Sequence, residues 1–453
     1  MKINLLLLLL GISLACFAQE QTNCSCTLNL KEIIADIETN YPGFAKKTNN
    51  GHLRGYLSVK KKALAEAQEV RNRENCFYLI ERYISFFKDN HIIFDDRQSM
   101  PSPARVIYNT KAKGKKDGLT GLWRRSADSL TIQIIKVAAS QYSAHLVANK
   151  KDHNSSGNIH FTLTGNDTEF RIRKHANWLT TAQQRGRRLD HLLIEPDGIW
   201  EKIIPGKLPS TRPTKLGSYN TQFTSQLLNE DTFYLGIPAF NINEKKFDSL
   251  IVNEIIPAIN VRKVKHLVID LRNNVGGNGS FLSLIRLVYD RPFSLPGDFL
   301  YDSPALIYRY QNAADKGSAQ HRAMLAKLIS HKGGFVQKDS LRVKIKETLE
   351  YPTKVSILVN ENCASSTEYF LILAKHSSKV KLFGRNTSGT LDYSELLSPE
   401  RLSCPGYIYM RPTSKSFYVD RQGIDQKGIV PDMDLSSYPD DQWIEVVLNN
   451  SQR

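Results

Sequence analysis

The strongest constraint on the fold is a series of short apolar segments that alternate with helical patterns between residues 220 and 450. His266–Leu271 and Val355–Asn360 are apolar at nearly every position, which is typical of strands buried on both faces of a parallel sheet. Further strand patterns lie at Phe233–Ile237, Val380–Phe383 and Tyr407–Met410. The helical patterns lie at Lys246–Asn260, Gly279–Tyr289 and Ser365–Lys375. This alternation predicts an α/β domain over residues 220–450.

Two further units precede this domain. Residues 27–100 have apolar positions at helical spacing, which predicts a helical N-terminal unit. Residues 101–215 contain short strand patterns separated by turn residues, which predicts a small antiparallel barrel or sandwich. A segment rich in Pro, Ser, Thr and Gly, Gly206–Tyr219, is the expected boundary before the α/β domain.

The first residues have the pattern of a secretory signal peptide. Lys2 is followed by the apolar run Leu5–Leu10, and small residues precede an expected cleavage after Ala18. The apolar run is shorter than the roughly 20 residues that span a bilayer, and no later run is long enough. We therefore expect residues 1–18 to be removed and the protein to be exported to the periplasm or the exterior. The alternative is a lipid anchor on Cys16, because Ala15-Cys16 resembles the end of a lipobox.

Cysteine usage agrees with export. Cleavage after Ala18 leaves Cys24, Cys26, Cys76, Cys363 and Cys404, and an oxidising compartment permits disulfides among them. Cys26–Cys76 and Cys363–Cys404 are plausible pairs, and buried free thiols are the alternative. The sequence contains no CxxC and no HExxH, and its histidines lack ligand spacing, so we expect neither a metal nor another cofactor.

The chain is basic. It has 61 Lys and Arg residues against 45 Asp and Glu residues, a formal net charge of +16. These cations are scattered and no nucleic-acid-binding motif accompanies them, so a solvated basic surface is the better interpretation. We expect no nucleic-acid partner.

The first candidate for chemistry is the strand-to-helix turn Val359-Asn-Glu-Asn-Cys-Ala-Ser-Ser-Thr-Glu368. In open α/β sheets, sites gather beyond the carboxyl ends of the strands. A helix that begins near Ser365 offers free backbone N–H groups and partial positive charge, which stabilise an oxyanion. The competing interpretation is an ordinary helix cap, with Glu368 completing a capping box.

The second candidate is the loop Asp270-Leu-Arg-Asn-Asn-Val-Gly-Gly-Asn-Gly279, which also lies between a buried strand and a helix. Paired glycines adopt conformations closed to other residues and let backbone N–H groups approach a ligand. The spacing fits neither a dinucleotide nor a P-loop fingerprint. A tight turn is the alternative.

Together the two loops resemble the C-terminal processing (tail-specific) serine protease family. The resemblance continues through Phe383-Gly-Arg-Asn-Thr-Ser-Gly389 and Gly428-Ile-Val-Pro-Asp432, and covers about residues 230–435 plus Asp89-Asn-His91. It implies a ClpP/crotonase-like protease core, a peptide or protein substrate and no cofactor. Residues 101–215 do not resemble the PDZ domain that many relatives carry, and we interpret them as a module for substrate binding or access.

The resemblance also implies site residues. The family nucleophile, three residues before the motif Glu, is Ser365, and Ser366 is the rival if the turn is shifted. The position of the family's catalytic lysine holds Thr390. The tricorn-like branch uses a histidine from the N-terminal region instead, which matches His91, and an acid that matches Asp425, although that acid is usually Glu. Lys427 is a fallback base.

These residues form a coherent chemical set. A serine hydroxyl needs an adjacent base, an imidazole can take its proton and return it to the leaving amine, and a carboxylate can orient the imidazole. Backbone N–H groups of Gly276 or Gly277 and of Ser366 are the expected oxyanion donors. The sequence thus predicts an exported serine peptidase that forms an acyl-enzyme on Ser365.

Two alternatives come from other functional classes. A catalytically inactive relative would bind peptides or partner proteins in the same cleft, and a long distance between His91 and Ser365 would favour it. A carbohydrate-binding or adhesion module in residues 101–215 would need an exposed aromatic platform, for which Trp123, Trp178 and Trp200 are the local tryptophans. The oligomeric state is left open.

Overall fold

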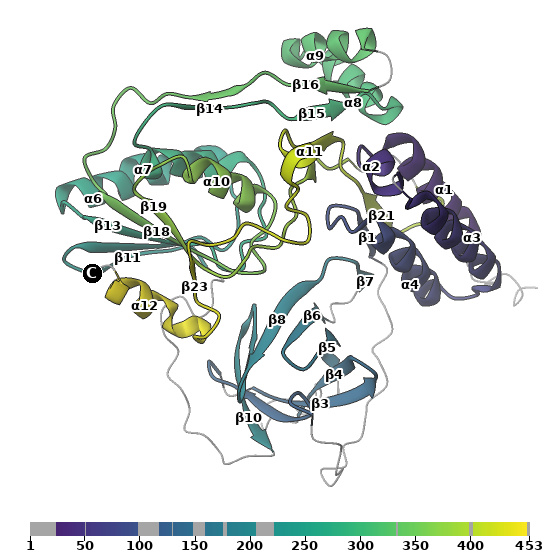
Figure 1. Ribbon diagram of the computed structural model, residues 1–453, viewed down its shortest axis with the longest axis horizontal. Coiled ribbons are helices and arrows are strands. Elements are labelled where there is room, and N and C mark those ends of the chain that lie inside the picture. Colours follow the sequence, from purple (N-terminus) through teal and green to yellow (C-terminus); the bar gives the residue numbers. More distant parts are fainter. Residues whose placement is uncertain are drawn as a thin grey trace, which may run out of the picture.

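The computed structural model describes residues 24–49, 51–97, 117–128, 130–147, 159–174, 179–204, 222–331, 334–397 and 402–450 (Figure 1). The expected signal peptide, Cys16, the boundary Gly206–Tyr219 and Trp178 lie outside these residues. Among the described helices, none combines the length and the apolarity that a membrane crossing requires.

The α/β domain is built on a six-stranded sheet with the strand order β11-β12-β13-β18-β19-β23. Its strands are β11 (Thr224–Asn229), β12 (Thr232–Gly236), β13 (His266–Asp270), β18 (Lys354–Val359), β19 (Val380–Gly384) and β23 (Met433–Asp434). All pairs are parallel except β11 with β12. The predicted α/β fold with a mainly parallel sheet is confirmed. The strands β12, β13 and β18 are buried almost throughout because helices cover both faces of the sheet.

One face of the sheet is covered by α5 (Glu244–Leu250), the π-helical turn η3 (Ile251–Ile255), α6 (Ile256–Val261), η4 (Gly279–Leu284), α7 (Ile285–Val288) and α10 (Ser366–Ala374). On the opposite face, α12 (Trp443–Asn450) buries Trp443 against Tyr234, Val268 and Leu358 (Figure 1). Between these layers, β13 and β18 are hydrogen-bonded neighbours and run parallel. The loops that follow these two strands therefore emerge at the same edge of the sheet.

The helical N-terminal unit consists of α1 (Cys26–Asn40), α2 (Phe44–Thr48), α3 (Leu53–Glu69), α4 (Arg73–Ile84) and the 3-10 turn η1 (Ser85–Phe87). Strand β1 (Ile93–Asp96) follows and pairs with both β21 (Tyr407–Met410) and β7 (Leu179–Thr180). Tyr407–Met410 was predicted as a strand of the α/β domain. It is a strand, but it pairs with β1 and does not belong to the six-stranded sheet. Its residues alternate between buried and half-buried, and Tyr407 and Tyr409 pack into the core of the helical unit. This strand thereby joins the helical unit to the C-terminal part of the chain.

Two disulfides lie in this region. Cys26–Cys76 is confirmed, whereas Cys404 pairs with Cys24 and not with Cys363. Cys404 belongs to the core of the helical unit, while Cys363 is buried under the α/β sheet as a free thiol that donates to the carbonyl of Leu271. The Cys24–Cys404 bridge joins residues 380 positions apart, so it restricts the unfolded chain strongly and is expected to contribute about 2–4 kcal/mol.

The β-rich region forms a closed barrel with the strand order β10-β2-β3-β4-β5-β6-β8-β9, which settles the choice between barrel and sandwich. Its strands are β2 (Gly121–Arg125), β3 (Thr131–Ala138), β4 (Gln141–Leu146), β5 (Ile159–Gly165), β6 (Glu169–Lys174), β8 (Gln184–Leu189), β9 (Leu192–Glu195) and β10 (Gly198–Ile204). Trp123 and Trp200 fill the interior and are 0% exposed. These two side chains therefore form no surface platform of the kind a carbohydrate-binding module requires.

An insertion in the α/β domain has no counterpart in the sequence predictions. It contains the hairpin of α8 (Pro304–Asp315) and α9 (Ala319–Ser330), which lies beside the helical unit in Figure 1. Its strands are β14 (Phe293–Leu295), β15 (Phe299–Tyr301), β16 (Phe335–Gln337) and β17 (Leu341–Val343). Strand β15 also pairs with β22 (Ser414–Lys415), which pairs in turn with β20 (Tyr393–Ser394). The insertion thus supports the segment around Tyr393.

Candidate active site

Ser365 occupies a strained turn at the start of α10. Its backbone has φ 55° and ψ −119°, a conformation that a non-glycine residue adopts only when its surroundings enforce it. The Ser365 N–H donates to the carbonyl of Thr390 (3.1 Å) and to Glu368 Oε2 (3.2 Å). The Glu368 half of the predicted capping box therefore forms.

The Ser365 hydroxyl meets His91 from the helical unit. His91 Nε2 lies 3.0 Å from Ser365 Oγ, although the two residues are 274 positions apart. His91 follows η1 and a left-handed Lys88 (φ 49°), and its own N–H donates to Asp89 Oδ1 (2.9 Å). The turn between η1 and β1 therefore carries the imidazole to the carboxyl edge of the α/β sheet. The structure brings the two expected residues within hydrogen-bond distance.

The second ring nitrogen of His91 determines the tautomer. His91 Nδ1 lies 2.5 Å from the carbonyl oxygen of Tyr393. A carbonyl can only accept, so Nδ1 must carry the proton and donate it. In the neutral ring, Nε2 is then the acceptor and faces the Ser365 O–H. This is the tautomer that a general base for serine requires.

Asp425 does not occupy the place behind the ring that the sequence analysis expected. Asp425 Oδ1 accepts the N–H of Asp392 (3.1 Å), and Oδ2 lies 3.3 Å from Lys47 Nζ. Because these contacts hold the short Asp side chain, a backbone carbonyl orients His91 instead. Asp392 directly precedes Tyr393, and its own carboxylate accepts the N–H of Asp425 (3.0 Å). Asp425 is therefore linked to His91 through the backbone of Asp392 and Tyr393.

Three carboxylates lie together behind His91, from Asp89, Asp392 and Asp425. Asp89 Oδ2 accepts the hydroxyl of Tyr41 (2.7 Å), in addition to the His91 N–H on Oδ1. Burial, together with the charges of Asp89 and Asp392, raises the pKa of Asp425 to about 8. A carboxyl group with this pKa is largely protonated at neutral pH, so Asp425 adds little negative charge behind the imidazole.

Glu368 has a larger role than the capping partner that the sequence suggested. Its carboxylate is 0% exposed and accepts four hydrogen bonds, from Ser365 N, Thr387 Oγ1, Gly389 N and Thr390 N. Burial raises the pKa of Glu368, while these hydrogen bonds act in the opposite direction. One side chain thus ties the strained serine to the loop of residues 387–390.

The glycine loop lies against the serine turn. A Cβ on residue 276 would stand 2.8 Å from the Ala364 carbonyl oxygen, 2.9 Å from Ser366 N and 3.0 Å from Ser365 Cβ, at a φ of +98°. Only glycine fits this approach. Asn274 fixes it further, because its carbonyl accepts the Ala364 N–H (3.1 Å).

The expected oxyanion donors divide into two groups. The N–H of Gly276 donates to Asn274 Oδ1 (2.9 Å), so its assignment as a donor is wrong. Within the described residues, the N–H groups of Gly277 and Ser366 have no hydrogen-bond partner, and both stay available to an oxyanion. The Ser366 hydroxyl donates to the Gly277 carbonyl (2.8 Å), so it is not aligned with His91 and the rival nucleophile is disfavoured.

The alternative bases are not placed for proton transfer. Thr390, at the family lysine position, has its hydroxyl bonded to the amide of Asn90 (3.1 Å) and near Ser388 Oγ (2.9 Å). Lys427 is exposed. Across the described part of the chain, no group of three or more His, Cys, Asp or Glu side chains is arranged to hold a metal ion.

The sequence analysis missed three contributors. The carbonyl of Tyr393 has no sequence signal, because any residue has one. Asp89 lies inside the quoted Asp89-Asn-His91 segment, and an Asp two residues before a histidine is a common turn pattern that could have drawn attention to it. The amide of Asn274 could have been suspected from its place beside the glycines, but its partners depend on the tertiary fold.

The buried Asp425 predicts a pH dependence of stability. An unfolded Asp has a pKa of about 3.9, whereas that of the folded residue is about 8, so the folded state binds more protons between these values. Stability contributed by protonated Asp425 is complete below about pH 4 and declines as the pH rises toward 8. We expect Asp425→Asn to remove this decline. The measurement is the melting temperature of the wild type minus that of the variant at each pH from 4 to 9, and this difference should fall as the pH rises. A difference that grows in favour of the wild type with rising pH would contradict the assignment.

Comparison with known proteins finds a family model that matches part of the chain. Residues 231–435 match the model described as peptidase family S41. The crystal structure of mature CPAF is similar with a TM-score of 0.53, 13% identity, and coverage of 94% of this chain and 96% of that one. Mature CPAF complexed with lactacystin gives a TM-score of 0.52, 12% identity, and coverage of 94% and 97%.

These structures share the fold. No curated protein matches the sequence. The residues that match the family model include the sheet from β12 to β23, both loops at its carboxyl edge and Ser365. Residues 231–435 therefore match peptidase family S41, which indicates a serine-type peptidase.

Proposed function

We propose that the protein is an exported peptidase that cleaves peptide bonds through an acyl-enzyme on Ser365, with His91 as the general base. The observation that carries this proposal is the 3.0 Å contact between His91 Nε2 and Ser365 Oγ, with Nδ1 held by a carbonyl. An inactive, peptide-binding relative would not need this alignment. The distance therefore favours hydrolysis over that alternative.

The reaction begins with attack of Ser365 Oγ on the scissile carbonyl. Nε2 of His91 takes the hydroxyl proton, and the N–H groups of Gly277 and Ser366 stabilise the oxyanion. The imidazolium then gives its proton to the leaving amine as the C–N bond breaks. Water, deprotonated by His91, attacks the acyl-enzyme, and the ester bond breaks as His91 returns that proton to Ser365 Oγ.

The surroundings of the ring support the charged intermediate. Tyr393 O holds the Nδ1 proton throughout, and the side chain of Asp89 bonds the His91 backbone N–H. In this proposal Asp425 is a positioning residue that acts through Asp392 and Tyr393. A backbone carbonyl thereby takes the orienting role that a carboxylate has in a Ser-His-Asp triad.

The nucleophile can be tested with a fluorophosphonate probe on purified protein. Ser365→Ala should abolish labelling, and His91→Ala should slow it by about 10⁴-fold because the hydroxyl loses its base. Ser318→Ala is the matched control, since Ser318 also lies close to a histidine (Oγ to His321 Nδ1, 2.7 Å) but belongs to the surface hairpin. Labelling that survives Ser365→Ala would reject the proposal.

The glycine loop gives a second test. Gly276→Ala should slow labelling by at least about 10-fold, because the new Cβ displaces the Ser365 turn. Gly317→Ala is the control: it has nearly the same φ (+96°) but open space around its Cβ position, so it carries the backbone strain alone. Equal labelling rates in the two variants would show that the loop does not set the position of the serine.

Export is supported by the pattern of residues 1–18 and by the two disulfides, which form in oxidising compartments. Mass spectrometry of the protein from its native host tests it. We expect a mature chain that begins at Gln19. A lipid-modified Cys16 would establish the anchored alternative, and an intact Met1 would rule out signal cleavage.

A further inference from the structure

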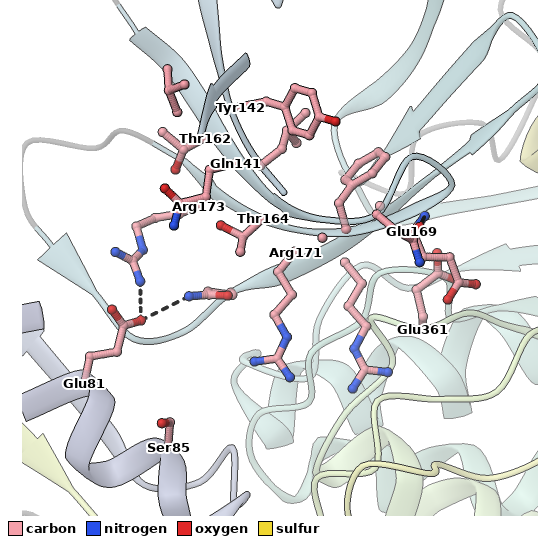
Figure 2. A pocket seen from close by; sticks show the side chains of 18 of the residues that line it. Glu81, Ser85, Gln141, Tyr142, Thr162, Thr164, Glu169, Arg171, Arg173 and Glu361 are labelled. Atoms are coloured by element: carbon pink, nitrogen blue, oxygen red, sulfur yellow. Dashed lines mark hydrogen bonds and ion pairs between the residues drawn. The ribbon is translucent and has the colours of Figure 1, made fainter. Parts of the chain in front are cut away.

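A cavity of about 1050 Å³ lies where three parts of the molecule meet. Its walls come from helix α4 and η1, from barrel strands β4, β5, β6 and β8, and from the α/β domain through Glu361 and Arg385. Figure 2 shows barrel side chains projecting into this space, with Glu81 and Ser85 on the helical side and Glu361 on the α/β side. The cavity is distinct from the Ser365–His91 contact, and no step proposed so far uses it.

Five arginines line the cavity, and their partners separate them into two groups. Arg82 forms an ion pair with Glu66. Arg173 forms an ion pair with Glu81, drawn as a dashed line in Figure 2, and Arg385 forms one with Glu169 (2.6 Å). Arg171 and Arg185 have no carboxylate within ion-pair distance among the described residues. These two are therefore the arginines of the cavity that lack a direct carboxylate partner, although the charges of Glu361, Glu368 and Glu169 act on Arg185 from further away.

The two arginines without a direct carboxylate partner face each other. Arg171 on β6 and Arg185 on β8 are directly opposite in the antiparallel register, where like charges destabilise a sheet. Burial and the charge of Arg171 lower the pKa of Arg185. The arrangement is unfavourable in the free protein, and an anion bound between the two guanidinium groups would relieve it.

Arg185 is also connected to the proposed catalytic residues. Its N–H and carbonyl bond to the side chain of Asn362 (2.7 and 2.9 Å), three residues before Ser365. Its guanidinium donates to the carbonyl of Ser388 (3.2 Å), whose hydroxyl lies 2.9 Å from that of Thr390. Gln426, next to Asp425, completes the cavity wall on this side. An anion at Arg185 would therefore sit beside the serine turn.

We propose that Arg171 and Arg185 form a subsite for a carboxylate of the substrate peptide. A guanidinium group matches a carboxylate in a planar two-bond contact, and two of them can hold one carboxylate from opposite sides. The cavity is large enough for several residues of an extended peptide. The subsite rests on the proposed peptidase activity and adds a preference to it: peptides with an acidic group a few residues from the cleaved bond.

The carboxylate has two sources in a peptide, an Asp or Glu side chain and the free carboxyl terminus. The test therefore uses matched peptides around one cleavage site: Glu or Gln at each flanking position, and each peptide with a C-terminal acid or amide. The readout is the ratio of kcat/KM between the acidic and the neutral member of each pair. In the wild-type protein we expect a ratio of about 10-fold to 100-fold for one position or for the terminus.

Variants assign the preference to the subsite. Arg171→Gln, Arg185→Gln and the double variant should reduce that ratio toward one, and Arg171→Glu should favour a Lys-containing peptide over the Glu peptide. Arg286→Gln is the control for net charge: Arg286 pairs with Asp248 outside the cavity lining, and its loss should leave the ratio unchanged. Melting temperatures confirm that each variant is folded.

The outcomes separate the two proposals. Peptide cleavage that depends on Ser365, with no acidic preference at any position, overturns the subsite and keeps the peptidase. If no peptide is cleaved, fluorescence anisotropy of the same peptides with the intact protein still decides the subsite. Tighter binding of the acidic members, lost in Arg171→Gln, would support it, and equal binding of acidic and neutral members would overturn it.

Discussion

The hydrogen bond from His91 Nδ1 to the carbonyl of Tyr393 is the interaction on which the site depends. It joins the helical N-terminal unit to the α/β domain, selects one tautomer of the imidazole and directs Nε2 to Ser365. Three further features keep these two units in contact. The β1–β21 pairing, the Cys24–Cys404 bridge and the β15–β22–β20 strands all tie the two segments together around Tyr393. A small shift between the units would break the His91–Ser365 contact before it unfolded either of them.

The rest of the site is held together by side-chain carboxylates and amides rather than by regular secondary structure. Glu368 accepts four hydrogen bonds from the serine turn and the loop of residues 387–390, and Asn274 joins the glycine loop to the same turn. Each of these groups is buried, so a missing partner would leave a desolvated polar group and destabilise the loop. Such fully bonded networks can maintain the strained backbone of Ser365. The strain keeps the hydroxyl toward His91 and leaves the N–H of Ser366 free.

The closed barrel contributes through its position. Strand β8 lies against the turn before Ser365 through the Asn362 side chain, so the barrel surface and the nucleophile share one rigid contact. Its interior is filled by Trp123, Trp200 and their neighbours, which leaves the outer face of β6 and β8 to interact with ligands. In the proposed subsite, Arg171 and Arg185 on that face give the barrel a role in choosing substrates. The linear sequence of residues 101–215 does not show this role, because the two arginines become neighbours only when β6 and β8 pair.

The sequence by itself determined the α/β core, because the strands β12, β13 and β18 are long apolar runs whose burial on two faces is a local property of composition. It also located the glycine loop and predicted Ser365 as the nucleophile, since Ser365 and Gly276–Gly277 follow two neighbouring strands in recognisable motifs. The tertiary structure alone decided what orients His91, because a backbone carbonyl has no sequence signature and Asp425 is held by Asp392 and Lys47. The tertiary structure likewise decided that Cys404 pairs with Cys24 and that the Gly276 N–H donates to Asn274. It also placed Arg171 directly opposite Arg185 in the barrel. These depend on contacts between distant segments, and such contacts are set by the packing of whole units rather than by the residues near each side chain.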